Sequence, residues 1–354
     1  MSGSSMDGLD IAYVVLEEKS GKWSYELAAT ECVAFEDAWK QNLAKCHSLS
    51  AKELLLMHTQ FGKWMGEAIL SFIDRHALHH KIHLISSHGH TVFHEPALGM
   101  TFQMGDGAAI AAATRLPVVS DLRNMDVALG GQGAPIIPIG EKLLWPSHQA
   151  FLNLGGIANI SFHHPEGHTV AYDVCAANRI LNTLALHEQK PYDDMGSMAA
   201  NGTLHTTLYD QLNALAYYRQ APPKSLSNEF GSQHILPLID TYQLHTYDAL
   251  HTYVHHIAHQ ISIAFTEYSP FTPGPLLVTG GGALNTFLIQ VLSEKLASQG
   301  IATELPDEQT ISYKEALVMA LIGILRWREE NNVLHIYSGA SRSSVGGALW
   351  MGQD

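Results

Sequence analysis

Residues 150–159, AFLNLGGIAN, join a short apolar stretch to a pair of glycines, and this combination decides the fold class. The first five residues predict a β-strand, and Gly155 and Gly156 predict a tight turn at its end. The combination recurs at residues 276–282, LLVTGGG, and a Gly/Ser turn at residues 2–8 precedes the apolar stretch 9–17. Each turn alone is consistent with a plain tight turn. Together they predict anion-binding loops, because glycine lets backbone N–H groups approach an anion without an intervening Cβ.

Strand and helix patterns alternate along the chain. Apolar, β-branched stretches predict strands at residues 9–17, 23–33, 82–86, 118–121, 150–154, 160–164, 169–173 and 276–279. Ser50 is the predicted N-cap of a helix over residues 50–78, and helical periodicity predicts further helices at 178–188, 194–201, 204–219, 246–268, 284–298 and 311–330. This alternation indicates an α/β protein with two similar halves. The Gly/Pro-rich stretch 130–140 is the best boundary, and it gives an N-terminal lobe of residues 1–135 and a C-terminal lobe of residues 136–354.

The composition excludes several classes of partner. The chain has 354 residues and a formal net charge of −14, with 20 Lys and Arg against 34 Asp and Glu. Binding to nucleic acid or to an anionic membrane needs a cationic face, which these residues do not supply. The three cysteines, Cys32, Cys46 and Cys175, have neither zinc-site nor disulfide spacing. The first ten residues do not have the basic and apolar segments of a signal peptide, and no apolar run approaches the ~18 residues of a membrane span. We therefore expect a cytoplasmic protein.

Common catalytic signatures are missing from the sequence. There is no GxxxxGK[ST] phosphate loop, no GxGxxG after a strand, no GxSxG elbow and no HExxH. The sequence therefore gives no support to a P-loop enzyme, a dinucleotide-binding fold, an α/β-hydrolase or a zinc protease. The three glycine turns remain as its distinctive feature.

Several longer motifs resemble those of the anhydro-N-acetylmuramic acid kinase family. They are MSGSSMDGLD at residues 1–10, SHGHTVFHEP at 87–96, DLRNMDVALGGQGAPIIP at 121–138, LNLGGIANIS at 152–161, PYDDMG at 191–196 and VTGGGALN at 278–285. They follow one another in the family's order over nearly the whole chain. The resemblance implies two RNase-H-like lobes of the actin-like ATPase fold around a central cleft. It also implies an ATP- and Mg²⁺-dependent enzyme that opens the 1,6-anhydro ring with water and phosphorylates O6, yielding N-acetylmuramic acid 6-phosphate in cell-wall recycling.

The resemblance assigns the glycine turns to ATP. Two opposed turns would hold the phosphates and the third would seat the adenosine, with Asp7 or Asp10 orienting magnesium through water. The expected ATP-binding residues are Gly3, Ser4, Ser5, Met6, Asp7, Gly8, Leu9, Asp10, Asn153, Gly155, Gly156, Asn159, Gly280, Gly281, Gly282 and Asn285. The magnesium ligands themselves are left open.

Asp173 is the expected general base, because it follows the predicted strand 169–173 and the reaction needs a carboxylate to take a proton from water. The alternative is that Asp173 caps the helix that follows it. The family commonly reads DTGPGN here, whereas this chain reads DVCAAN at residues 173–178, without either glycine. This departure leaves the backbone contribution of the loop in question, although Asp173 and Asn178 remain.

The resemblance also implies sugar ligands at Thr91, Arg123, Asn178 and Glu315. Arg123 suits a bidentate bond to the lactyl carboxylate, and its alternative is an ion pair with Asp121 or Asp126. Glu315 is expected in the first turn of a helix, where complementing the helix dipole is the alternative role. His88, His90 and His94 alternate along a predicted strand, which suggests a metal site only for side chains on one face. His90 stands where the family has Gln.

A further departure, together with those at residues 173–178 and at His90, keeps other hypotheses open. In the family a strand of some six to nine residues precedes the first motif, and without it we expect exposed apolar neighbours and a less constrained first loop. A non-catalytic nucleotide- or sugar-binding homologue is therefore one alternative, and a kinase for another sugar is a second. PPKSLSNEFG at residues 222–231 carries no chemistry readable from its residues. The resemblance implies a dimer surface or substrate contact there, and a homodimer is expected.

Overall fold

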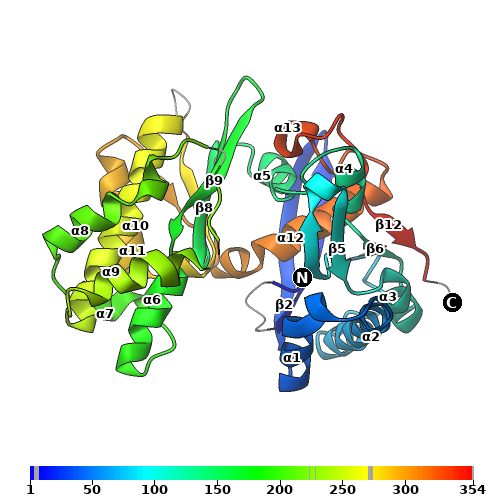
Figure 1. Cartoon of the computed structure of the whole chain (residues 1–354). Helices are drawn as coiled ribbons and strands as arrows, with labels where there is room; N and C mark the ends of the chain where they lie inside the picture. The colour runs from blue at the N-terminus through cyan, green and yellow to red at the C-terminus, as the bar shows by residue number, and fades with distance from the viewer. Residues whose placement is uncertain (4–7, 223, 228, 270–273, 353–354) are drawn as a thin grey trace. The chain divides into compact units, whose positions relative to one another are not determined.

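The chain forms two compact units in the computed structural model, which describes residues 1–3, 8–222, 224–227, 229–269 and 274–352 (Figure 1). The first unit comprises Met1–Trp145 and Tyr313–Asp354, and the second comprises Pro146–Ser312. One helix, α12 (Glu308–Trp327), runs from the second unit into the first. Tyr313 interrupts its helical geometry with φ −118° and ψ 17°, at the point where the units divide.

The first unit combines short sheets with helices that pack against them. Its elements besides α12 are β1 (Gly8–Lys19), β2 (Lys22–Ala34), α1 (Asp37–Lys45), α2 (Ala51–Arg75), β3 (Ile85–Ser86), β4 (His90–Glu95), β5 (Met100–Met104), α3 (Gly107–Thr114), β6 (Val118–Ser120), α4 (Asn124–Ala128), α5 (Pro138–Leu144), α13 (His335–Ser338) and β12 (Ala348–Trp350). The strands form three sheets, ordered β1-β2, β12-β6-β3 and β4-β5. Helix α2 packs on α3 and β1, and α3 packs on β6 and β12.

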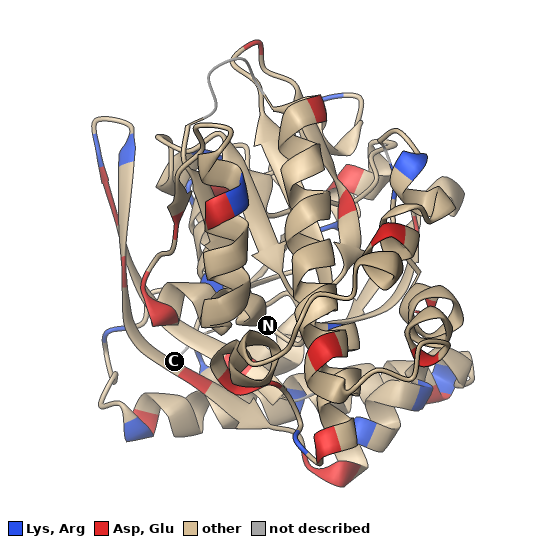
Figure 2. Cartoon of the chain, turned by 90° about the vertical axis from the view of Figure 1, so that its left-hand side faces the viewer, with Lys and Arg blue, Asp and Glu red and all other residues tan. Residues whose placement is uncertain are grey.

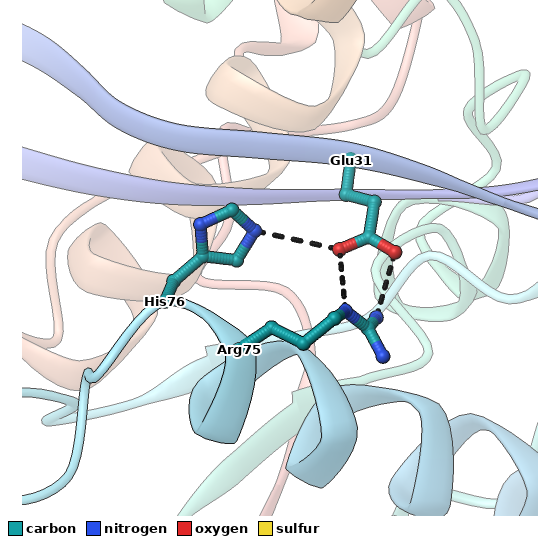
Figure 3. Close-up of polar contacts among 3 residues, drawn as sticks. All are labelled: Glu31, Arg75 and His76. Carbon is teal, nitrogen blue, oxygen red and sulfur yellow. Dashed lines mark hydrogen bonds and ion pairs between the residues drawn. The ribbon is translucent and has the colours of Figure 1, made fainter.

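Helix α2 begins and ends with side-chain contacts that fix its position. Ser50 and Glu53 form a reciprocal capping box at its start, as its sequence predicts. At its end Arg75 makes two hydrogen bonds to the Glu31 carboxylate on β2, with Nε–Oε2 at 3.1 Å and Nη2–Oε1 at 2.6 Å (Figure 3). His76 Nε2 lies 3.4 Å from the same carboxylate. This contact ties the last turn of α2 to the β1-β2 hairpin.

A cavity of about 290 Å³ separates β1 from β3 in the first unit. Its lining is mostly apolar and includes the stretch from Leu9 to Leu16 along β1, the stretch from Lys81 to Ser87, and side chains of α2 and α12. The hydroxyls of Ser86 and Ser87 are buried at this wall without a hydrogen-bond partner. The cavity explains why the predicted strand 82–86 shortens to Ile85–Ser86. Residues 82–84 face the cavity, and the described strands offer them no partner there.

The second unit is built on one mixed sheet of five strands. Its elements are β7 (Ala150–Leu154), β8 (Ile157–His163), β9 (Thr169–Ala176), α6 (Asn178–Ala185), α7 (Ser197–Ala200), α8 (Thr206–Asn213), a 3₁₀ turn (Ala216–Arg219), α9 (Leu236–Asp240), α10 (Thr246–Tyr268), β10 (Leu276–Thr279), α11 (Thr286–Ala297) and β11 (Thr303–Glu304). The strand order is β11-β10-β7-β8-β9. Strands β7, β8 and β9 are antiparallel neighbours, whereas β10 and β11 run parallel to β7. This is the RNase-H-like order, so the α/β expectation is confirmed.

Helix α10 forms the centre of the core of the second unit. It packs against α6, α7, α8, α11 and β9 and spans residues 246–268, as its periodicity predicts. Its fully buried residues include Tyr253, Ile257 and Ile261, which join the apolar residues of β7, β8 and β10 in one cluster. The predicted helix 204–219 is instead split into α8 and the 3₁₀ turn. On the side of the chain in Figure 2, segments with Lys and Arg are interspersed with segments with Asp and Glu.

The division into units differs from the expected boundary between residues 135 and 136. Helix α5 packs on β2, and a Cβ at its Gly140 would lie 2.4 Å from Val318 Cγ2 on α12. The C-terminal strand β12 pairs with β6, with Ala348 opposite Ser120. These contacts place residues 136–145 and the segment after Ser312 with the first unit.

Candidate functional site

Four polar residues form one row across the sheet of the second unit. Asp173 on β9 lies opposite Asn159 on β8, Asn159 lies opposite Asn153 on β7, and Asn153 lies opposite Thr279 on β10. Residues directly opposite one another point to the same face of a sheet, so the four side chains share one face. Val174 is skipped in the pairing of β8 with β9, which makes a β-bulge beside Asp173. The sheet thus brings Asp173 into line with Asn153 and Asn159, two predicted site residues of the LNLGGIANIS motif.

The Gly155-Gly156 turn connects β7 to β8 and lies against the start of α6. The N–H of Asn178 donates to Gly155 O at 3.1 Å, and the N–H of Ala177 donates to Gly156 O at 2.9 Å. Both carbonyls therefore point at the helix start and satisfy its unpaired amides. In a trans peptide the N–H points opposite to the carbonyl, so the N–H groups of Gly156 and Ile157 point away from α6. The turn caps the helix and presents its donors on the other side.

The Gly280–Gly282 turn approaches the same strand end so closely that side chains are excluded. Gly280 has φ +81°, and a Cβ there would lie 2.4 Å from Asn153 Oδ1. A Cβ on Gly282 would lie 2.7 Å from Leu154 Cβ and 3.0 Å from Asn178 Oδ1. Asn178 Nδ2 in turn donates to Leu154 O at 2.9 Å. The two predicted glycine turns and Asn178 therefore meet at one end of the sheet.

Asn285 lies next to this turn but has a structural task as well. Its Oδ1 accepts the N–H of Leu288 at 2.9 Å and so caps α11. A Cβ on Gly196, which has φ +74°, would lie 2.1 Å from the same oxygen. Asp193, from the same motif as Gly196, accepts N–H bonds from Met198 and Ala199 at the start of α7. The PYDDMG motif therefore packs against Asn285, the residue that follows the Gly280–Gly282 turn and Leu284.

Asp173 does not cap the helix that follows it. Helix α6 has Ala177 as its N-cap and no side-chain cap. The Asp173 carboxylate instead accepts the N–H of Leu226, with N–Oδ2 at 2.9 Å. The side chain is half-buried, and burial raises its pKa while the Leu226 N–H opposes that rise. A carboxylate with a raised pKa and one oxygen without a partner among the described residues is suited to accept a proton.

Two features near this group escaped the sequence analysis. The exposed Arg179 at the start of α6 lies beside Gly156, with its Nε 3.8 Å from the position of a Cβ there. The only sequence signal for Arg179 is its position directly after the predicted site residue Asn178. A guanidinium there would be a cation beside a phosphate-binding turn. The second feature is a set of three hydrogen bonds between Asp173 and the residues Tyr217, Lys224 and Leu226. The sequence carries no sign of these bonds, because the contacts arise between distant parts of the chain.

The predicted site residues of the first unit gather around the N-terminal residues and β4. Ser4, Ser5, Met6 and Asp7 lie outside the described residues. Met1 and Asp10 exchange backbone hydrogen bonds of 2.7 and 2.9 Å, and Ser2 pairs with Leu9 in an antiparallel bridge. Gly3 follows directly, and Gly8 admits no side chain because a Cβ would lie 2.6 Å from Cys32 Sγ. Residues 1 and 2 are therefore fastened to the start of β1.

His88 holds Arg123 in a defined orientation. Arg123 Nε donates to His88 Nε2 at 2.8 Å, and its Nη1 donates to Gly133 O at 2.6 Å. The expected alternative, an ion pair with Asp121 or Asp126, does not occur among the described residues; Asp126 accepts from Gly133 N and Ser338 Oγ. Burial and the nearby guanidinium lower the pKa of His88 to about 3, so it stays neutral and accepts.

Glu315 and Thr91 complete the predicted sugar ligands. Glu315 lies well inside α12 rather than in its first turn, two residues after the irregular Tyr313. Crowding by protein atoms raises the pKa of the Glu315 carboxyl although solvent reaches its side chain, and Arg123 opposes that rise. Thr91 is exposed on β4 opposite Gln103. Thr91, Arg123 and Glu315 thus belong to the first unit, whereas Asp173 and Asn178 belong to the second.

The alternating histidines make separate contacts instead of converging. His90 Nδ1 lies 3.0 Å from Ser2 Oγ, and His94 Nδ1 lies 3.0 Å from Thr101 Oγ1. In the described part of the chain no three His, Cys, Asp or Glu side chains are placed to hold a metal ion. Nor does any helix in that part have the length and apolar character needed to cross a membrane.

The second unit combines glycine turns at strand ends with a carboxylate, Asp173, on the same sheet. In an α/β protein this combination is typical of a phosphotransferase. The model of the anhydro-N-acetylmuramic acid kinase family matches residues 1–352, and the chain belongs to this family. An anhydro-N-acetylmuramic acid kinase of Synechococcus elongatus is 32% identical over 94% of this chain and 92% of its own length. Those of Vibrio vulnificus and Vibrio cholerae are 31% and 32% identical, each over 99% of this chain and 96% of their own length.

Two solved structures show a weaker likeness. One is an activator of 2-hydroxyisocaproyl-CoA dehydratase from Clostridium difficile with bound ADPNP, 15% identical with a TM-score of 0.36 over 61% of this chain and 71% of that one. The other is component A of (R)-2-hydroxyglutaryl-CoA dehydratase from Acidaminococcus fermentans, 18% identical with a TM-score of 0.35 over 58% of this chain and 68% of that one. Likeness at this level has no bearing on function.

Proposed function

We propose that the protein is an ATP-dependent kinase that opens 1,6-anhydro-N-acetylmuramic acid with water and phosphorylates its O6, giving N-acetylmuramic acid 6-phosphate. Membership of the family makes it a sugar phosphotransferase of peptidoglycan recycling. The observation that supports the assignment to this site is the row from Thr279 to Asp173, which sets one carboxylate on the sheet face whose strand ends carry two glycine turns. Fold alone would not identify the reaction.

The chemistry assigns Asp173 the proton transfer. Its carboxylate takes a proton from water as the water oxygen bonds to the anomeric carbon. The bond between that carbon and O6 breaks, and its electron pair stays on O6. O6 then bonds to the γ-phosphorus while the bond to the leaving ADP breaks. Burial raises the pKa of the Asp173 carboxyl, and the single N–H that the carboxylate accepts opposes that rise.

The remaining predicted residues bind and orient the substrates. Arg123, fixed by His88 and by Gly133 O, is suited to the lactyl carboxylate of the sugar. Thr91, Asn178 and Glu315 are proposed sugar contacts. Phosphoryl transfer depends mainly on positioning and charge neutralisation, which the donors of the glycine turns supply for ATP. Arg179 beside Gly156 adds a cation to that surface.

Magnesium is proposed as the accompanying ion. Mg²⁺ favours carboxylate oxygens and keeps several waters. Among the described residues near the first glycine turn, the half-buried Asp10 at the start of β1 supplies such a carboxylate. Bound there, the ion would neutralise charge on the phosphates. A cytoplasmic location and a homodimer remain proposals that follow from the resemblance; sedimentation velocity would measure the second.

A coupled ATP-consumption assay with 1,6-anhydro-N-acetylmuramic acid tests the function. We expect turnover by the wild type, phosphomonoester formation by ³¹P NMR, and a loss of about 10²- to 10⁴-fold in Asp173→Asn. Asp240→Asn, an exposed carboxylate at the end of α9, is the matched control and should keep full activity. ATP binding without turnover on any amino sugar would identify a non-catalytic homologue. Turnover only on neutral hexoses would identify a kinase for another sugar.

A further inference from the structure

Asp173 is fastened to one short stretch of chain by both of its backbone groups and by its carboxylate. Tyr217 Oη donates to Asp173 O at 2.5 Å, and the N–H of Asp173 donates to Lys224 O at 3.3 Å. The N–H of Leu226 donates to the carboxylate Oδ2 at 2.9 Å. We call this stretch the 217–226 segment; residue 223 lies outside the described part.

The topology of the sheet explains why Asp173 needs these partners. Strand β9 is the edge strand of the described sheet, so backbone groups that point away from β8 have no strand to pair with. At Asp173 the 217–226 segment takes the place of that strand. The bulge at Val174 changes the twist of β9 next to Asp173, so the direction of its side chain depends on what holds the edge.

Lys224 strengthens the segment through two aromatic rings. Its ammonium lies 4.9 Å from the centre of the Tyr217 ring and 5.2 Å from that of Tyr172, the residue before Asp173. It also donates to Tyr217 O at 3.4 Å. Cation–π contacts are stronger where the ammonium is partly desolvated. Lys224 thus links Tyr217 to the strand that carries Asp173.

A catalytic role for Tyr217 itself does not fit these contacts. Its hydroxyl proton is directed at the Asp173 carbonyl, and burial raises the pKa of the phenol further from neutrality. The group acts on the backbone of Asp173. It is therefore a positioning residue and not a proton donor.

We propose that the 217–226 segment is the positioning element of the catalytic carboxylate, with Tyr217 fixing the backbone of Asp173 and the Leu226 N–H fixing and stabilising its charged side chain. This inference rests on the proposed function, in which Asp173 is the general base. The Leu226 N–H selects one rotamer by binding Oδ2, which leaves the other oxygen for the attacking water. Removal of that N–H leaves the charged carboxylate less stabilised.

The Leu226 pair of variants tests the carboxylate contact. Leu226→Pro removes both the leucine side chain and the backbone N–H. Leu226→Ala also removes the leucine side chain but keeps the N–H. We expect the acid limb of the kcat/KM profile to move to higher pH in Leu226→Pro and to stay in place in Leu226→Ala. A ¹³C titration of the Asp173 carboxyl, assigned with Asp173→Asn, should show the same shift without any turnover. Equal profiles for the two variants would overturn this part of the proposal.

Tyr217→Phe tests the backbone contact by removing one hydroxyl. We expect kcat to fall by about 10- to 100-fold with little change in the KM values, because misplacement of a catalytic group affects the chemical step. A purely structural role would lower Tm and leave kcat unchanged, which would contradict the proposal. If Tyr217→Phe does not fold, Lys224→Met loosens the same ring and should give the same pattern in kcat.

The failure of this inference can be told apart from that of the proposed function. If Asp173→Asn retains turnover, the base is misassigned and the proposed mechanism fails. If Asp173→Asn is inactive while Tyr217→Phe, Lys224→Met and Leu226→Pro match the wild type in kcat and pH profile, only the positioning role fails.

Discussion

The Lys314 ammonium and the Glu141 carboxylate form a buried ion pair, with Nζ–Oε1 at 2.8 Å and side-chain exposures of 7% and 6%. Lys314 follows the irregular Tyr313 in α12, and Glu141 lies in α5, shortly before Trp145. The ammonium is also 5.8 Å from the centre of the Trp145 ring. The pair therefore joins the two points at which the chain leaves and re-enters the first unit.

Breaking this pair should be more damaging than replacing it. We expect Lys314→Met to lower the free energy of unfolding by about 3–5 kcal/mol, because it removes the positive charge beside a buried carboxylate. The double variant Lys314→Met/Glu141→Leu should recover much of that loss. Urea unfolding measures both. Lys40→Met removes an exposed pair of 3.9 Å with Asp37 and should change stability by no more than about 1 kcal/mol. A single variant as stable as this control would contradict the expectation.

Gly280→Ala should impair ATP binding beyond the strain of its backbone angle. The new Cβ would meet Asn153 Oδ1 at 2.4 Å and push the turn away from the end of β7. Gly300→Ala is the matched control, because Gly300 has φ +76° but open space around it. Both variants should lose about 1 kcal/mol of stability from the positive φ. Only Gly280→Ala should raise the KM for ATP severalfold in steady-state kinetics, and equal KM values would refute a role for this turn.

His88→Leu should weaken sugar binding through Arg123. The variant removes the acceptor for Arg123 Nε, so the guanidinium keeps only its bond to Gly133 O. We expect the KM for the sugar to rise by about tenfold while the KM for ATP stays unchanged, as for loss of one charge-assisted hydrogen bond. His83→Leu, a histidine of the same segment that lines the cavity, serves as a control. A rise in both KM values would indicate general damage instead.

Stability should fall as the pH drops, because His256 is buried in its neutral form. Its Nδ1 lies 2.7 Å from Asn213 Oδ1 and its Nε2 lies 3.0 Å from Tyr218 Oη, and burial lowers its pKa to about 3. Below pH 6.5 the unfolded chain takes up a proton that the folded chain does not bind until about pH 3. The free energy of unfolding should therefore decrease between these values, by up to about 1.4 kcal/mol per pH unit for this residue.

The variant His256→Gln should reduce the pH dependence of the free energy of unfolding, because one proton fewer is taken up on unfolding. Urea unfolding at several pH values between 7 and 4 gives the slope, and the exposed His47→Gln should leave it unchanged. An unaltered slope in His256→Gln would show that the native state binds the proton as readily as the unfolded chain.

Local features of the chain were predictable from the sequence, and distant contacts were not. The period of α10 and the capping box at Ser50 are set by residues within a few positions of one another. The alternative partners considered for Arg123 were two aspartates close in sequence, whereas the partner in the structure, His88, is 35 positions away. Tyr217 lies 44 positions from Asp173, and nothing in a tyrosine's neighbours indicates such a hydroxyl contact.

The predicted strand 82–86 illustrates a second limit. Its apolar residues indicate a strand correctly, but a strand also needs a neighbour that accepts its hydrogen bonds. On the side of β3 away from β6 lies the cavity, and the ladder with β6 begins only at Ile85.

The cavity between β1 and β3 also has a consequence for handling the protein. Along its wall β1 keeps one edge beyond Asp10 that no described strand covers, flanked by apolar side chains. An uncovered apolar edge is a template onto which extended chain from another molecule can add. Self-association should therefore grow with concentration and temperature, and an apolar hexapeptide fused ahead of Met1 should suppress it by occupying the edge from within.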